Sequence, residues 1–184
     1  MGAERTTVKV LIGGSGGQGV LTLGKVVAYA GLEAALEVSC LPSYSAEMRG
    51  GYVHCSVVLS RGKSSFSPVI SRADIGVFMN ERAYAMLSPS VESTGVLIVN
   101  SSFISPPGRR GRVLAVKATE CAEELGSLRA ANMLMAGMLG WALIRCGIPL
   151  DLDHIRSGIE QVFPGGAEQE ISRKAAACGW EAAR

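Results

Sequence analysis

The chain has 184 residues, of which 48% are hydrophobic and only 5% aromatic. It is long enough for one domain whose core is built from aliphatic side chains and methionine. Its 18 basic and 16 acidic residues give a net charge of +2. This balance argues against a dedicated nucleic-acid-binding protein, which concentrates basic charge on one face.

The apolar segments exclude two further classes of protein. The longest, over 130–144, is shorter than the ~20 residues that a membrane crossing needs, and Asn132 interrupts it. We therefore expect a buried helix there and no membrane association. Residues 1–10 lack the long apolar region of a signal peptide, which predicts a cytoplasmic protein.

The cysteines argue against a metal cluster on this chain. Their number is odd, their spacing is wide and no pair is separated by two residues: Cys40, Cys55, Cys121, Cys146 and Cys178. Zinc and iron–sulfur sites usually need closely spaced thiolates. We expect scattered, reduced thiols and no bound metal.

The hydrophobic pattern predicts an α/β fold in a single layered domain spanning 1–184. A buried strand over 7–13 leads through a glycine loop into a helix over 20–32, a βαβ-type start. Further strands are predicted over 36–42, 52–60, 73–80, 95–102 and 112–118, and an extended segment over 64–70 predicts an antiparallel hairpin with 52–60. The sheet is expected to be mixed but mostly parallel over about 8–118. The helical part covers about 119–182, with breaks at Pro149 and Pro164.

The glycine loop is the first candidate site. It fits the pattern G-x-G-x-x-G between a strand and a helix, with the residues Gly14, Ser15, Gly16, Gly17, Gln18 and Gly19. Backbone amides at such a helix start favour a phosphate. Binding of NAD also needs an acidic residue at the end of the second strand. Glu33 and Glu37 come too early for that role, so NAD is disfavoured, and a tight turn whose glycines only permit close packing remains an alternative.

A second candidate loop follows the second predicted strand. Pro42 ends that strand, and a polar turn follows, formed by Pro42, Ser43, Tyr44 and Ser45. Two charged side chains and a second glycine pair follow: Glu47, Arg49, Gly50 and Gly51. Because both loops lie at strand ends, we expect them to lie side by side. An exposed turn with an ion pair is the alternative.

Three motifs in order, over about residues 8–102, resemble the gamma subunit of 2-oxoacid:ferredoxin oxidoreductases. They read GGSGGQGVLTLGKVVAYAG, LPSYSAEMRGGYVHCSVVLS and SPVISRADIGVFMN. The later stretch RAANMLMAGMLG, which carries Asn132, is similar to the family's asparagine-containing helix. The family commonly has Tyr-Gly-Pro-Glu where this chain has Tyr44-Ser45-Ala46-Glu47. Pyruvate, 2-oxoglutarate, ketoisovalerate and indolepyruvate members all share this domain.

The resemblance implies a division of labour. In such enzymes a 2-oxoacid and coenzyme A become acyl-CoA and carbon dioxide, and electrons pass to ferredoxin. Thiamine diphosphate and iron–sulfur clusters are expected on thiamine-binding and ferredoxin-like partner subunits. This chain is expected to be non-catalytic, and His54 and His154 with it. The two loops and Asn132 are expected to bind the phosphate of coenzyme A or to dock the partner subunits. A stand-alone nucleotide-binding oxidoreductase of Rossmann type is the alternative.

Overall fold

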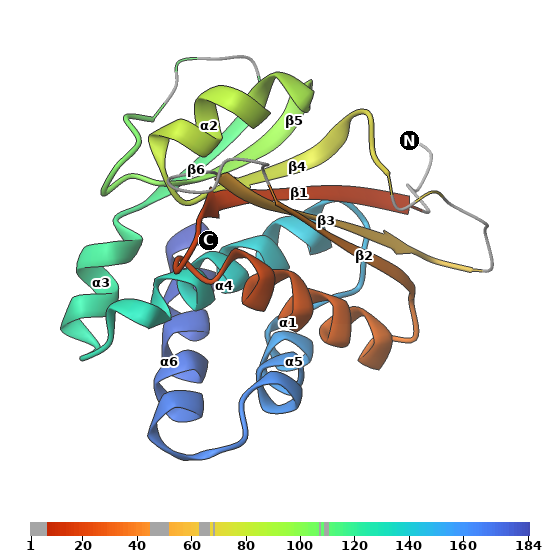
Figure 1. Ribbon diagram of the computed structural model, residues 1–184. Helices are drawn as coiled ribbons and strands as arrows, with labels where there is room; N and C mark the ends of the chain where they lie inside the picture. The colour runs from red at the N-terminus through yellow and green to blue at the C-terminus, as the bar shows by residue number, and fades with distance from the viewer. Residues whose placement is uncertain (1–6, 45–51, 63–66, 68, 107, 109–110) are drawn as a thin grey trace.

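The computed structural model describes residues 7–44, 52–62, 67, 69–106, 108 and 111–184. These residues form one six-stranded sheet flanked by helices (Figure 1). The strands are β1 (Thr7–Ser15), β2 (Glu37–Tyr44), β3 (Tyr52–Ser60), β4 (Ala73–Phe78), β5 (Val91–Asn100) and β6 (Arg112–Val116). The helices are α1 (Val20–Glu33), α2 (Glu81–Leu87), α3 (Ala118–Glu124), α4 (Ala131–Arg145), α5 (Leu152–Val162) and α6 (Gly166–Ala183).

The strand order β2-β3-β1-β4-β5-β6 makes the sheet mixed but mostly parallel, which confirms the predicted fold class. Strands β1, β4, β5 and β6 pair in parallel. Strand β3 pairs antiparallel with both β1 and β2. Consequently β1 and β2 run in the same direction, as in a βαβ unit, but β3 lies between them.

The predicted hairpin between 52–60 and 64–70 is wrong, because the antiparallel partners of 52–60 are β1 and β2. Both edges of β3 are occupied by β1 and β2, so the segment that follows β3 has no free edge to pair with. Of that segment, the described residues Ser67, Val69 and Ile70 belong to no strand. The antiparallel character of this part of the sheet therefore comes from β3 itself.

Pro42 does not end the second strand, contrary to the prediction. Strand β2 continues to Tyr44, and Pro42 lies opposite Cys55 in the ladder. Strand β2 is at the edge of the sheet, where proline is tolerated because its missing N–H can face outward. Pro42, Ser43 and Tyr44 are thus strand residues, and the polar turn predicted from Pro42 is corrected.

The helices cover the two faces of the sheet unequally. In Figure 1, α1, α4, α5 and α6 lie together on one side, and α2 lies alone on the other. Successive strand side chains alternate between these layers: Ile12 belongs to the larger core with α1 and α4, and Leu11 and Phe78 belong to the smaller core with α2. The predicted helical C-terminal part is confirmed by α3 to α6.

Helix α4 is the centre of the larger core. Every residue from Ala131 to Leu143 is buried, which confirms the buried helix predicted from the apolar stretch. The guanidinium groups of Arg112 and Arg145 lie 4.4 and 4.9 Å from the centre of the Trp141 ring, and both make cation–π contacts with it. Among the described residues, no helix is long and apolar enough to cross a membrane.

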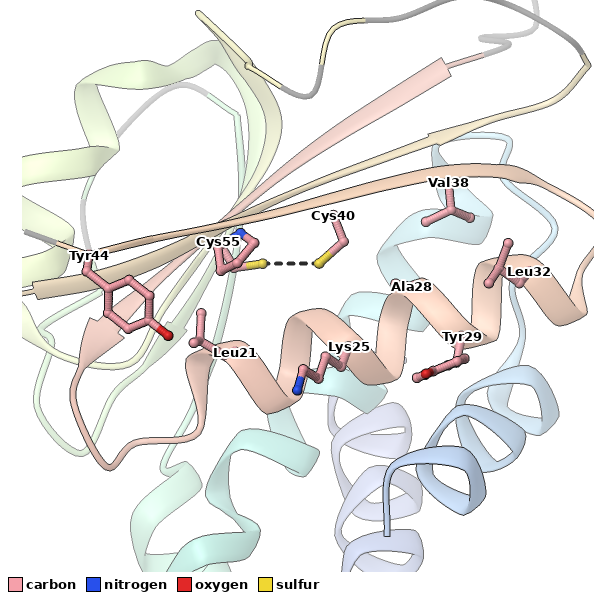
Figure 2. A pocket seen from close by; sticks show the side chains of 10 residues that line it. Leu21, Lys25, Ala28, Tyr29, Leu32, Val38, Cys40, Tyr44 and Cys55 are labelled. Carbon is pink, nitrogen blue, oxygen red and sulfur yellow. Dashed lines mark hydrogen bonds between the residues drawn. The ribbon is translucent and has the colours of Figure 1, made fainter.

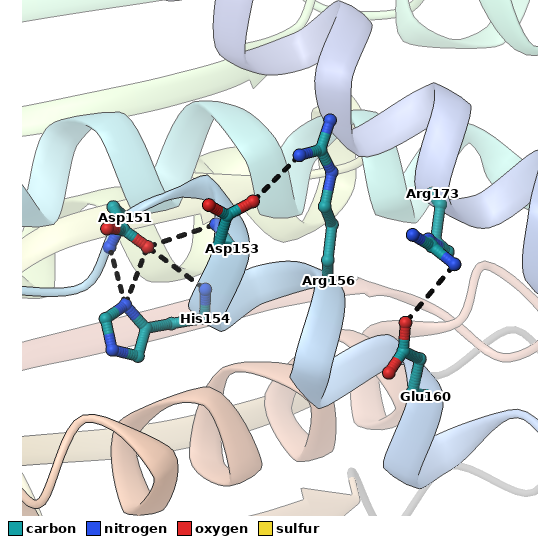
Figure 3. A network of polar contacts seen from close by, with 6 residues as sticks. All are labelled: Asp151, Asp153, His154, Arg156, Glu160 and Arg173. Atoms are coloured by element: carbon teal, nitrogen blue, oxygen red, sulfur yellow. Dashed lines mark hydrogen bonds and ion pairs between the residues drawn. The ribbon is translucent and has the colours of Figure 1, made fainter.

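Polar contacts fix the start of α5 and its junction with α6 (Figure 3). The Asp151 carboxylate accepts the backbone N–H of His154, and the His154 ring reaches back to the backbone N–H of Asp151. This reciprocal arrangement is a capping box. Arg173 of α6 pairs with Glu160 of α5 at 3.3 Å. The structure therefore places His154 in a helix cap.

Glycines let α4 and α6 approach at backbone distance. A Cβ on Gly137 would overlap the carbonyl oxygen of Ala176, and a Cβ on Gly179 would overlap that of Leu134. We predict that Gly137→Ala and Gly179→Ala each lower the free energy of unfolding by about 1–3 kcal/mol or more, because the helices must separate. Urea unfolding followed by circular dichroism would measure this.

Gly108→Ala is the matched control, because a Cβ there meets no atom within 4 Å. Intrinsic helix propensity alone predicts the opposite sign, a gain of about 1 kcal/mol for alanine in a helix. A gain in stability in both helical variants would therefore contradict the close α4–α6 contact.

Candidate functional site

The carboxyl ends of β1 and β4 form a topological switch point. These neighbouring parallel strands are followed by α1 and α2, which lie on opposite faces of the sheet (Figure 1). The two connections therefore diverge from this edge of the sheet. Ligands of open α/β sheets bind at such switch points. The predicted glycine loop lies here, because Gly14 and Ser15 end β1 and Gly19 precedes α1.

The glycine loop presents its backbone to open space. Gly17 and Gly19 have φ angles of 86° and 71°, which favour glycine. Gly16 and Gly17 are exposed, and a Cβ on either would meet no atom within 4 Å. Helix α1 has neither a side-chain cap nor an acidic residue in its first turn. The partial positive charge at its N-terminus is therefore available to an anion.

Asn80 joins the two sides of the switch point. Its amide Nδ2 donates to Ser15 Oγ at 2.8 Å and to Gln18 Oε1 at 2.6 Å. Its Oδ1 accepts the backbone N–H of Ala83 and so caps α2. One side chain therefore fixes the glycine loop and the start of α2 together. This role is not among the sequence-based predictions, although asparagine between a buried strand and a helix is a capping signal.

Asn132 reaches the loop from α4, 113 positions along the chain from Gly19. Its Nδ2 donates to the Gly19 carbonyl oxygen at 3.1 Å. The side chain is almost fully buried, and Asn132 Oδ1 has no hydrogen-bond partner among the described residues. Such an orphaned buried acceptor is rare in folded proteins. Any side chain on Gly19 would overlap Asn132, so this contact also requires glycine at the helix start.

The second predicted loop is only partly described. Ser43 lies opposite His54 on β3, and His54 lies opposite Gly13 on β1, so the end of β2 shares an edge of the sheet with the glycine loop. Tyr44 is 70% exposed there. The remaining predicted residues of this loop lie outside the described part of the chain: Ser45, Glu47, Arg49, Gly50 and Gly51.

His54 lies beside the glycine loop on β3. Its ring stacks on Tyr52 with 5.8 Å between ring centres. Burial lowers the pKa of His54, which favours the neutral imidazole. A catalytic role for it is not tested by these contacts, and the expectation that it is non-catalytic stays a prediction.

A hollow of about 530 Å³ lies between α1 and β2, along the flank of α1. Leu21 and Tyr44 line one end and Leu32 the other (Figure 2). Cys40 and Cys55 also line it, with their sulfur atoms 3.4 Å apart. Their wide sequence spacing predicted scattered thiols, but the β2–β3 pairing brings these two together. Within the described ranges, no three His, Cys, Asp or Glu side chains gather closely enough to hold a metal ion.

We predict that Asn80→Asp loosens the glycine loop without unfolding the protein. Aspartate retains the cap of α2, but it loses the two amide donations to Ser15 and Gln18. Amide hydrogen exchange over 15–19 should become faster, while the free energy of unfolding falls by about 1–3 kcal/mol. Asn80→Ala, which also loses the cap, should be less stable by about a further 1 kcal/mol. Unchanged amide hydrogen exchange over 15–19 in both variants would contradict the role of Asn80 in fixing the glycine loop.

A protein-family model and several known proteins match this chain in sequence. The family model described as pyruvate ferredoxin/flavodoxin oxidoreductase matches residues 9–182. The ketoisovalerate oxidoreductase subunit VorA of Methanothermobacter thermautotrophicus is 35% identical over 162 residues, which cover 88% of this chain and 33% of VorA. This chain thus spans about a third of that relative's length.

Two solved structures share the fold. The gamma subunit of a keto/oxoacid ferredoxin oxidoreductase from Geobacter sulfurreducens superposes with a TM-score of 0.77, at 23% identity, over 96% of this chain and 98% of that one. The 2-oxoglutarate:ferredoxin oxidoreductase of Magnetococcus marinus, solved with 2-oxoglutarate, coenzyme A and succinyl-CoA bound, gives a TM-score of 0.82 at 22% identity. That match covers 98% of this chain and 31% of the larger one.

Proposed function

Because this chain belongs to the pyruvate ferredoxin/flavodoxin oxidoreductase family, we propose that it is a non-catalytic gamma-type subunit of a 2-oxoacid:ferredoxin oxidoreductase. In the assembled enzyme a 2-oxoacid is oxidatively decarboxylated with coenzyme A, and the electrons pass to ferredoxin. Thiamine-binding and ferredoxin-like partner subunits carry the thiamine diphosphate and the iron–sulfur clusters. This chain contributes to assembly and presents the glycine loop to coenzyme A.

The observation that carries the coenzyme A proposal is the open, uncapped start of α1 at the switch point. Gly16 and Gly17 leave room for a phosphate against the backbone, and the helix N-terminus favours its charge. Arg49, outside the described residues, is the proposed charged partner, since guanidinium pairs well with phosphate oxygens. The Magnetococcus relative, solved with coenzyme A, supports this choice of ligand.

Docking of a partner subunit on the same loop is the second use that the geometry favours. Tyr44 is 70% exposed beside it, and exposed tyrosine is typical of interface residues. Both uses depend on an accessible loop backbone, so the experiments must separate ligand binding from assembly.

The sheet order argues against the stand-alone Rossmann-type enzyme. In that fold the ribose-binding acid ends a strand that lies next to the first strand. Here β3 lies between β1 and β2, and β2 ends in Ser43 and Tyr44.

We predict that the purified chain alone neither binds NAD nor turns over a 2-oxoacid. Calorimetric titration with NAD and an activity assay with an artificial electron acceptor would check this, and activity without partners would overturn the subunit proposal.

The loop proposal predicts a selective defect in coenzyme A use. Gly16→Val adds a side chain where the described residues leave open space, so a defect in an enzyme that folds and assembles points to a ligand. Steady-state kinetics of the assembled enzyme should show the KM for coenzyme A raised about ten- to a hundredfold by Gly16→Val and by Arg49→Ala, as expected for losing a charged hydrogen bond. The KM for the 2-oxoacid should change much less.

Gly108→Val is the control, because its Cβ also meets open space but lies in the loop before β6. Size-exclusion chromatography must first show that each variant assembles. An assembled Gly16→Val enzyme with an unchanged KM for coenzyme A would exclude the phosphate-binding role. Failure of that variant alone to assemble would assign the loop to docking.

A further inference from the structure

Two thiols of unequal exposure face each other on the sheet side of the hollow between α1 and β2 (Figure 2). Cys40 Sγ and Cys55 Sγ are 3.4 Å apart. Cys40 is partly exposed towards the hollow, whereas Cys55 is only 1% exposed. An accessible thiol beside a buried one suits the oxidation of a dithiol by thiol–disulfide exchange, since the accessible sulfur attacks a disulfide from solution and the buried one closes the intramolecular bond.

The pairing of β2 with β3 sets this contact. Cys40 lies opposite Val57 and Cys55 lies opposite Pro42, so the two cysteines are diagonal neighbours on the same face of the sheet. Helix α1 packs directly over them at Gly24, where a Cβ would come within 2.5 Å of Cys55 Sγ. The sulfurs are therefore held between the sheet and the helix backbone, with Cys40 at the open side.

The surroundings make the two thiols chemically unequal. A hydrogen bond from Cys55 lowers the pKa of Cys40 to about 7, burial opposes this shift, and the charge of Lys25 lowers it further. The same contact and burial raise the pKa of Cys55 above its usual range. The lowered pKa raises the thiolate fraction of Cys40 at pH 7, and the thiolate is the nucleophile. Among the described residues, the other titratable side chains that line the hollow are Tyr29 on α1 and Tyr44 on β2.

We propose that Cys40 and Cys55 form a redox-active dithiol that exchanges with small disulfides entering the hollow. The Cys40 thiolate attacks one sulfur of R–S–S–R, the S–S bond breaks, and RS⁻ leaves. That RS⁻ takes the Cys55 proton, and the Cys55 thiolate attacks Cys40 Sγ and releases the second RS⁻, which is protonated by water. The dithiol loses two electrons to the small disulfide, so one Cys40–Cys55 disulfide and two small thiols result.

The hollow favours disulfides that carry an acidic group. Lys25 lines it together with Cys40 and supplies a positive charge. Leu21, Leu32 and Tyr29 provide an apolar wall along α1 that can receive an uncharged arm. A disulfide with carboxylate arms should therefore react faster than one of similar size with ammonium arms.

Glutathione disulfide and cystamine are the probes for the full chain. After incubation, alkylation of the remaining thiols and proteolysis without reductant, mass spectrometry should find the Cys40–Cys55 peptide pair, reversible by dithiothreitol. Cys55→Ser should stop at the mixed disulfide and add one glutathionyl group to Cys40. Cys40→Ser should form neither product. Lys25→Gln should slow the reaction with glutathione disulfide about threefold relative to that with cystamine.

Cys178→Ser is the matched control, because it removes an exposed thiol and should leave the Cys40–Cys55 product unchanged. The alkylation rate of Cys40 in the wild-type chain should reach half its maximum near pH 7. Mapping the wild-type chain needs no substitution, so it decides the question even if a serine variant fails to fold. Modification of Cys178 without any Cys40–Cys55 bond would overturn the proposal.

Discussion

Helix α1 packs closely against β3 on one side and α5 on the other because glycines remove side chains between them. Gly24 and Gly31 bring α1 against the sulfur of Cys55 and the side chain of Leu59 on β3. Gly158 of α5 lies against the backbone of α1 at Val26 on its other side. The position of α1 fixes both the glycine loop at its start and the hollow along its length, so both candidate sites depend on this close packing.

The switch point acquires its shape from contacts between distant segments. Asn80 donates hydrogen bonds to Ser15 and Gln18 at the switch point, and Asn132 donates one to the carbonyl oxygen of Gly19 from the core. These amides fix the loop from two sides but leave Gly16 and Gly17 exposed. A loop that is rigid at its ends and open at its tip suits a site that receives a ligand or a partner, since little ordering remains to oppose binding.

The N-terminus and the flank of α1 border two sites with different chemistry. Its N-terminus offers backbone amides and a partial positive charge, which recognise an anion without any reactive side chain. Its flank covers a thiol pair whose reactivity depends on burial and on Lys25. Helix α1 borders both sites. A change in the Cys40–Cys55 contact would therefore alter the packing of the same helix whose N-terminus follows the glycine loop.

Local patterns in the sequence were sufficient for the features that depend on neighbours along the chain. The glycine loop follows from a strand–glycine–helix succession, the buried α4 from an apolar stretch with no polar face, and the family from several motifs in order. Only tertiary structure decided the insertion of β3 between β1 and β2, the continuation of β2 through Pro42, the role of Asn80 and the meeting of Cys40 with Cys55. These depend on strand order and register, which are set by the surfaces that distant segments bury together and not by the local composition of either strand.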